Sequence, residues 1–218
     1  MKPLLLGLAA LVACSVSLLF AADDTTKGKQ LGEDVYRAAG GENWDKVQTI
    51  QFSFVVEKGG QTVAKAEHLW NVPEQTDEVK WKGRDVKVNL ADPGTGADAK
   101  AAYARWVNDS YWLLAPLKLM DRGVTLTAEG TKEINGAQRE VLRLSFAQVG
   151  LTPTDNYRLY IDPATKMVTY WDYMPKGEKG MSGTWDDYQK AGGLTLATDH
   201  KMDGGLRIRI ANLKVTRK

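Results

Sequence analysis

The side chains that most often catalyse reactions or bind metals are few and dispersed in this sequence. His68 and His200 are the only histidines, and each lies in a stretch with the alternating pattern of a β-strand. They could share a site, but a metal site normally requires three or more convergent ligands, and no H-E-x-x-H spacing occurs. We therefore expect no metal site.

Acid–base and nucleophilic catalysis also lack a suitable arrangement. Asp186 and Asp187 are adjacent on a predicted strand, so their carboxylates point to opposite faces and cannot act as a close pair. Asp109-Ser110 lies in a predicted helix without the glycine pattern of a nucleophile elbow, and no glycine-rich loop is arranged to hold phosphates. We expect a protein that is not an enzyme and that uses no cofactor.

Charge and aromatic content narrow the classes of partner. The 29 basic and 27 acidic residues give a formal net charge of +2, and the basic residues are dispersed, so we expect no binding to nucleic acid. Seven tryptophans and eight tyrosines, several of them on predicted strands, suit a wall that is apolar on its face and polar at its rim. Ordinary core packing is the alternative interpretation of the same residues.

The N-terminus has the pattern of an export signal. A short positive region precedes an apolar segment over residues 4 to 21, which is short for a membrane span. Two routes stay open: cleavage after Ala21, which gives a periplasmic protein, or lipidation of Cys14 in the stretch Leu-Val-Ala-Cys, which gives a membrane-anchored lipoprotein. We favour a signal peptide over 1–21 and a single domain over 22–218, because an apolar stretch rather than a polar tether follows Cys14.

Hydrophobic periodicity predicts a mainly β chain of the α+β type. A short amphipathic helix ends at Gly40-Gly41, and from Ile50 onward the apolar period changes to two. About eleven short strands follow in hairpin succession, and a second helix is inserted after the fourth strand, from Ala101 to about Ala115. The apolar phase of the last strand slips, which predicts a β-bulge near Asn212. The pattern indicates a single curved antiparallel sheet, an unclosed β-barrel, with helices on one face.

The stretch from Ile50 to Trp81 has a distinctive order of aromatic strands and turns. Its sequence, IQFSFVVEKGGQTVAKAEHLWNVPEQTDEVKW, resembles the opening meander of the LolA and LolB family of lipoprotein-sorting proteins. The stretches NDSYWLLAPLKL, RLYIDPATKMVTYWDY and LTLATDHKM are similar to an uncharacterised branch of that superfamily. The resemblance covers nearly all of the mature chain and implies an unclosed barrel whose helices form a lid over an apolar cavity for acyl chains. In the carrier an arginine before the proline helps to hold the lid, and Val72 occupies the matching place here.

Strand alternation and the inserted helix suggest which residues line such a cavity. One wall comes from aromatic residues of the first strands, and the inserted helix supplies the lid. The opposite wall contains either Tyr170 or Trp171, because neighbouring residues of a strand point to opposite faces. In the alternative, the helix fills the sheet and these residues are core. The candidate ligand-binding residues are Phe52, Phe54, Trp70, Trp81, Trp106, Leu113, Leu114 and Tyr170.

These features predict an exported monomer that binds a lipid or an acylated protein in outer-membrane lipoprotein sorting, with envelope proteins as further partners. Two other classes stay open: a non-catalytic envelope interaction or sensing module with a filled cavity, and a lipoprotein receptor tethered to the outer membrane through Cys14. Whether the cavity is open or filled distinguishes the lipid-binding protein from the interaction module, because a lipid-binding protein needs room for an acyl chain.

Overall fold

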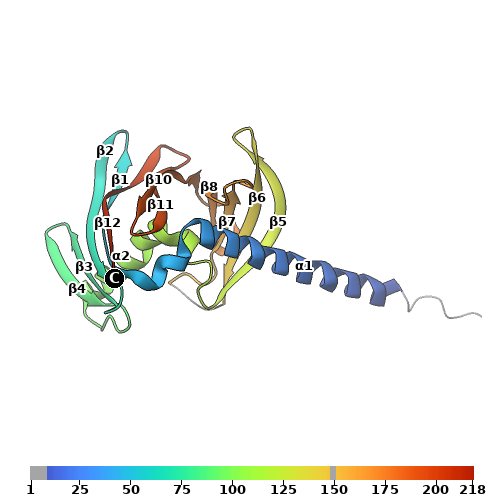
Figure 1. The fold of residues 1–218 in the computed structure, drawn as a ribbon, viewed down its shortest axis with the longest axis horizontal. Helices are drawn as coiled ribbons and strands as arrows, with labels where there is room; N and C mark the ends of the chain where they lie inside the picture. Colours follow the sequence, from blue (N-terminus) through green and yellow to red (C-terminus); the bar gives the residue numbers. More distant parts are fainter. Residues whose placement is uncertain (1–8, 148–150) are drawn as a thin grey trace, which may run out of the picture.

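A computed structural model describes the backbone of residues 9–147 and 151–218, and the side chains from residue 23 onward within these ranges. It shows a curved, mainly β structure with a long N-terminal helix and a second helix in its concave interior (Figure 1). The elements in chain order are α1 (Ala9–Ala38), η1 (Gly41–Lys46), β1 (Val47–Lys58), β2 (Gln61–Asn71), β3 (Thr76–Trp81), β4 (Arg84–Asn89), α2 (Ala97–Leu114), η2 (Ala115–Leu117), β5 (Val124–Ile134), β6 (Ala137–Phe146), β7 (Asn156–Ile161), β8 (Val168–Met174), η3 (Pro175–Gly177), β9 (Ser182–Thr184), β10 (Asp186–Ala191), β11 (Leu194–Lys201) and β12 (Leu206–Arg217).

The strands form two antiparallel sheets, neither of them closed. One sheet has seven strands in the order β10-β11-β12-β1-β2-β3-β4, and the other has five in the order β5-β6-β7-β8-β9. A bridge between Gly183 of β9 and Met202, next to β11, connects them. The expected unclosed β-barrel with an N-terminal and an inserted helix is confirmed. Its strands are divided between two sheets instead of forming the single sheet expected, because an isolated bridge rather than a continuous ladder joins β9 to the segment that follows β11.

The first helix ends where the sequence predicts. α1 stops at Ala38, and Gly40 has φ 81°, in the left-handed region that favours glycine. The predicted cleavage after Ala21 and the lipidation of Cys14 lie outside the residues whose side chains are described. Over the described residues, the structure has no helix that is long and apolar enough to span a membrane.

Glycine allows α1 to lie directly on the five-stranded sheet. A Cβ atom on Gly28 would be 2.7 Å from the Leu126 carbonyl oxygen and 2.8 Å from the Ala128 nitrogen. Real side chains do not approach backbone atoms so closely, so this contact between helix and strand requires glycine. α1 therefore covers β5.

The predicted bulge in the last strand is present. The pairing of β1 with β12 shifts register between Gln51 and Ser53, and Asn212 adopts φ 55°. The Asn212 side-chain amide donates a hydrogen bond to the Ser53 hydroxyl at 3.2 Å. The extra residue bends β12 and restores the apolar face of the strand after the slip in phase.

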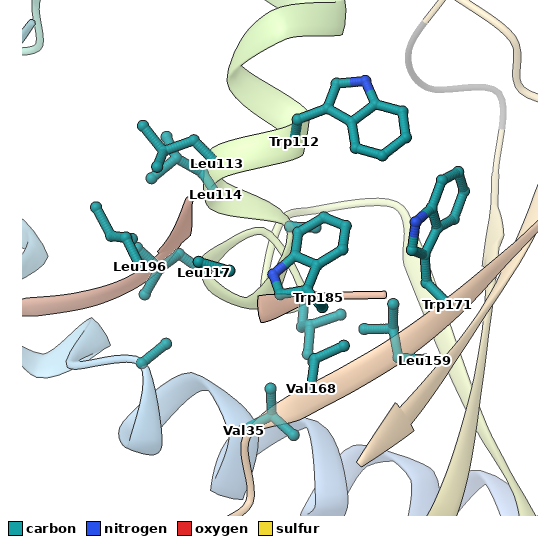
Figure 2. Packing of buried hydrophobic residues seen from close by; sticks show 14 of the residues in the cluster. Val35, Trp112, Leu113, Leu114, Leu117, Leu159, Val168, Trp171, Trp185 and Leu196 are labelled. Carbon is teal, nitrogen blue, oxygen red and sulfur yellow. The ribbon is translucent and has the colours of Figure 1, made fainter. Parts of the chain in front are cut away.

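The inserted helix lies between the two sheets (Figure 1). The main core joins the facing sides of both sheets, the end of α1 and one side of α2. Figure 2 shows Leu113 and Leu114 of α2 beside Leu196 of β11, with Val35 of α1 on the far side of the cluster. This side of α2 is packed, while its other side faces the five-stranded sheet.

Candidate ligand-binding cavity

A cavity of about 470 Å³ lies between α2 and the five-stranded sheet. This volume falls within the range of small-molecule binding sites, roughly 300–1,000 Å³. The helix side, including the turn after α2, contributes Trp106, Val107, Ser110, Tyr111, Trp112 and Ala115. The sheet side contributes Leu144 and Phe146 of β6, Tyr157 of β7, Trp171 and Tyr173 of β8, and Trp185 between β9 and β10.

Aromatic rings contribute to both walls of the cavity and are most of the sheet-side residues named above. The rings of Trp112 and Trp171 meet edge to face, with centroids 4.8 Å apart and an interplanar angle of 83°. Figure 2 shows the indoles of Trp112, Trp171 and Trp185 around a common space, and Trp112 and Trp185 are stacked at 6.1 Å. Edge-to-face and stacked contacts of this kind are favourable arrangements of aromatic rings, and they give both walls apolar surface.

The rim of the cavity is both charged and apolar. Lys118 forms an ion pair with Asp121 at 3.7 Å, and its ammonium group lies over the Trp106 ring. Arg122 is exposed and has no ion pair among the described residues. Leu151, 56% exposed, also belongs to the rim. The apolar chain of a ligand can therefore enter the cavity past Leu151 while its polar head stays beside Lys118 and Arg122.

Five lining side chains carry a buried polar atom that has no hydrogen-bond partner in the described part of the chain. Most buried polar atoms in proteins are paired, so a group of unpaired ones around one cavity is unusual. The atoms are Trp106 Nε1, Ser110 Oγ, Tyr111 Oη, Trp171 Nε1 and Trp185 Nε1.

Of the residues predicted from the sequence to bind a ligand, only Trp106 lies on this cavity. Trp81 belongs to a small separate cluster, and Tyr170 is on the other face of β8, with its hydroxyl 3.3 Å from both carboxylate oxygens of Asp203. Trp171, the alternative to Tyr170, faces the cavity. The remaining predicted residues lie in the packed core: Phe52, Phe54, Trp70, Leu113 and Leu114.

Sequence reasoning did not assign the helix-side residues of the cavity apart from Trp106. Val107, Tyr111 and Ala115 recur at intervals of four, and Ser110 lies beside them on the same side of α2. This stripe was visible in the sequence. Ser110, Tyr111 and Ala115 are small or carry a hydroxyl, so the stripe does not resemble an apolar helix face. The sequence pattern therefore favoured Leu113 and Leu114 as the residues that line the cavity.

A second polar cluster lies on the opposite side of α2. His68 of β2 is within 2.7 Å of Asp77 Oδ2 through Nδ1 and within 3.1 Å of Asp109 Oδ2 through Nε2. All three side chains are buried, and the Phe52 ring stacks on the imidazole at 4.6 Å. The cluster, which we call the latch, joins β2 and β3 to α2.

The latch keeps His68 charged. Burial by itself lowers the pKa of His68, but the hydrogen bonds to Asp109 and Asp77 and the charges of both carboxylates outweigh burial and raise the pKa to about 9. The positive imidazolium then donates a hydrogen bond to each carboxylate. The sequence resemblance places Val72 where the carrier has its lid-holding arginine, and the latch supplies a different ionic contact between sheet and helix.

His200 of β11 has the opposite environment. Its ring lies 4.2 Å from that of Trp185 and 5.4 Å from that of Trp112, and the side chain is fully buried. Burial lowers its pKa to about 4. His200 and His68 occupy different environments. The described residues contain no group of three or more histidine, cysteine or acidic side chains that could hold a metal ion.

Several solved structures are similar to this chain over most of its length. A DUF1329 family protein from Desulfovibrio piger is 12% identical with a TM-score of 0.53, and the match covers 88% of this chain and 92% of that one. A LolA superfamily protein from Nitrosomonas europaea is 8% identical with a TM-score of 0.54, covering 86% and 94%. A putative outer membrane lipoprotein-sorting protein domain from Vibrio parahaemolyticus is 12% identical with a TM-score of 0.52, covering 88% and 93%. No protein-family model matches the sequence, and neither does a curated protein. At these identities the likeness concerns the fold, and at that level it confirms the resemblance seen in the sequence.

Proposed function

We propose that this chain, which has a LolA/LolB-like fold, binds the acyl chain of a lipid or of a lipid-modified protein in the cavity between α2 and the five-stranded sheet. The observation that carries the proposal is an open cavity of about 470 Å³ with aromatic walls. Transfer of each methylene from water into such a site contributes about 0.8 kcal/mol. Ten methylenes would thus contribute about 8 kcal/mol, comparable to the cost of association.

The cellular setting is part of the same proposal. We propose that the protein is exported, acts in the periplasm in lipoprotein or lipid handling at the outer membrane, and contacts other envelope proteins there as a monomer. The export-like N-terminal pattern supports this setting, as do the names of the structural neighbours from Nitrosomonas and Vibrio. The role is one of binding rather than catalysis. A module with a filled cavity is the weaker alternative, because the cavity is open.

Binding of a fluorescent fatty acid to the protein recovered from the cell envelope tests the proposal. Val124→Trp places a large ring at the cavity lining and is expected to weaken binding at least tenfold, because the ring occupies the space of the acyl chain. Val63→Trp is the matched control, because Val63 is 57% exposed on β2 and does not line the cavity. Absence of binding to the wild type, or equal weakening by both variants, would refute the proposal.

Native mass spectrometry of the same preparation tests the setting. A mass that corresponds to cleavage after Ala21, together with a lipid adduct, is expected. A diacylated Cys14 would instead indicate the tethered receptor, and a protein without any adduct would favour the interaction module.

A further inference from the structure

Exposed apolar side chains gather at the rim of the cavity. The described residues include five large hydrophobic side chains that are exposed, and three of them lie in the turns over 118–122, 151–155 and 175–181, which we call the rim turns. Leu151 is 56% and Met181 43% exposed, and both line the cavity. Met120 is 37% exposed and lies between Lys118 and Arg122, which also line it. Scattered exposed hydrophobic residues are ordinary, but their gathering at one opening indicates an interaction surface.

Two of the rim turns are joined by a buried carboxylate. Asp155, 5% exposed, accepts a hydrogen bond from the Tyr173 hydroxyl at 2.6 Å and another from the Lys176 backbone N–H at 3.2 Å. The backbone N–H of Tyr173 donates to the Met181 carbonyl at 2.8 Å. The turns that carry Leu151 and Met181 are therefore fixed to each other.

Basic side chains stand among these apolar ones. In the rim turns the basic residues that are at least partly exposed outnumber the exposed acidic ones: Lys118, Arg122, Lys176 and Lys179 against Asp121 and Glu178. Asp121 is paired with Lys118 at 3.7 Å, and the carboxylate of Asp155 is buried under the turns. The exposed charge of the rim therefore complements an anionic surface.

This arrangement suits a membrane better than a folded protein partner. A stable protein interface buries about 800 Å² on each side in a closely fitting patch. Leu151 and Met181 instead stand at an opening, where a folded partner would meet a void. A bilayer interface adapts to separate apolar tips and offers phosphate groups to the cations around them.

We propose that the rim turns dock the protein on membranes rich in anionic phospholipid, with Leu151 and Met181 inserted among the headgroups and the rim cations beside the phosphates. This goes beyond the proposed function, because docking requires no ligand in the cavity. It directs the opening of the cavity to the bilayer, so an acyl chain would pass between the two without crossing water.

Sedimentation with phospholipid vesicles tests the docking. The full chain is mixed with vesicles of phosphatidylcholine alone or of an equal mixture of phosphatidylcholine and phosphatidylglycerol. We expect at least tenfold stronger binding to the anionic vesicles at low salt and a loss of this preference at high salt, because exposed charges are screened. Equal binding to the two kinds of vesicle at low salt would overturn the proposal.

Two double variants test whether the apolar tips make the contact. Leu151→Asp with Met181→Asp is expected to weaken binding to the anionic vesicles at least tenfold, because it removes the apolar area that inserts. Val63→Asp with Leu69→Asp is the matched control, because these residues of β2 are 57% and 43% exposed, lie outside the cavity lining and receive the same charge. Equal weakening by both would refute the rim as the docking surface.

The basic residues are tested in the same way. Lys176→Ala with Lys179→Ala is expected to weaken binding at least tenfold, since each lysine near an anionic surface contributes about fivefold. Lys58→Ala with Lys82→Ala, in the exposed hairpin turns after β1 and β3, is the control and should leave binding within about twofold. A control that lost as much would overturn the assignment to the rim.

A dye at the rim reports the contact directly, even where the N-terminus itself binds the vesicles. Leu151→Cys labelled with an environment-sensitive dye is expected to shift to shorter wavelength on anionic vesicles, and Val63→Cys is expected to show no shift. The wild type, labelled in the same way, gives the signal of Cys14. A rim dye that does not shift would overturn the docking even if the protein sediments.

Binding of the fluorescent fatty acid in the absence of vesicles separates this inference from the proposed function. Fatty acid binding without docking would overturn the inference and leave the proposed function intact. Docking without fatty acid binding would refute the proposed function and support the inference.

Discussion

The two sides of α2 show how similar residues produce a packed core in one place and a cavity in another. Toward the seven-stranded sheet, Leu113 and Leu114 are buried against aromatic and aliphatic side chains, and Asp109 is held in the latch. Toward the five-stranded sheet, Ser110 and Tyr111 of the same helix face a cavity and carry polar atoms without a partner. The helix is thus packed on one side and borders a cavity on the other.

This difference means that aromatic content alone does not indicate a binding site. Phe52 and Trp70 belong to the filled side, while Trp171 and Tyr157 belong to the open side. What distinguishes the open side is the void, because buried polar atoms without a partner occur on both sides, Trp70 Nε1 on the filled one among them. A filled core leaves little room for a void, because protein interiors are closely packed.

Truncating one phenylalanine on each side gives the largest expected contrast. Phe52→Ala removes a ring that is 1% exposed and is expected to lower the free energy of unfolding by about 4 kcal/mol. Phe146→Ala removes a half-buried ring that already borders the cavity, so we expect a loss of about 1–2 kcal/mol together with altered ligand binding. Urea denaturation measures both losses. Equal losses would show that the two sides are packed alike.

Removing one member of the latch tests whether it holds α2. Asp109→Ala leaves buried His68 with one of its two carboxylate partners and is expected to lower the free energy of unfolding by about 3 kcal/mol. Asp121→Ala, at the exposed rim, is the control and should change the same quantity by less than about 0.5 kcal/mol. A loss no greater than that of the control would mean that the latch contributes little to the stability of the fold.

The pKa values of the two histidines should lie on opposite sides of the ordinary value, which is about 6.5. Because the pKa of folded His68 is about 9 and that of an unfolded histidine about 6.5, its contribution to stability is complete below pH 6.5 and is lost as the pH rises through 9. The loss amounts to about 3 kcal/mol. His200 has a folded pKa of about 4, so the unfolded chain takes up its proton first and stability falls as the pH drops from 6.5 toward 4.

Imidazole NMR measures these titrations directly, because the sequence contains only two histidines. We expect one ring to stay protonated up to about pH 9 and the other to stay neutral down to about pH 4. Two rings that both titrate near pH 6.5 would contradict the difference in environment on which the comparison depends.

Local features of the fold were predictable because their signals lie within a few residues. The end of α1 follows from Gly40, which adopts a positive φ, and the bulge at Asn212 follows from a slip in apolar phase. The insertion of α2 after the fourth strand follows from a change of period. The order of elements followed from these local signals.

The sequence alone therefore determined the mainly β class, the unclosed succession of hairpins and the position of the inserted helix, since periodicity and turn chemistry act over short distances. Only the tertiary structure decided that Trp171 rather than Tyr170 faces the cavity, and that His68 meets Asp109 across 41 positions of the chain. The two faces of a strand are equivalent until another element covers one of them. A void depends on the summed volumes of side chains from distant segments, which no local pattern contains.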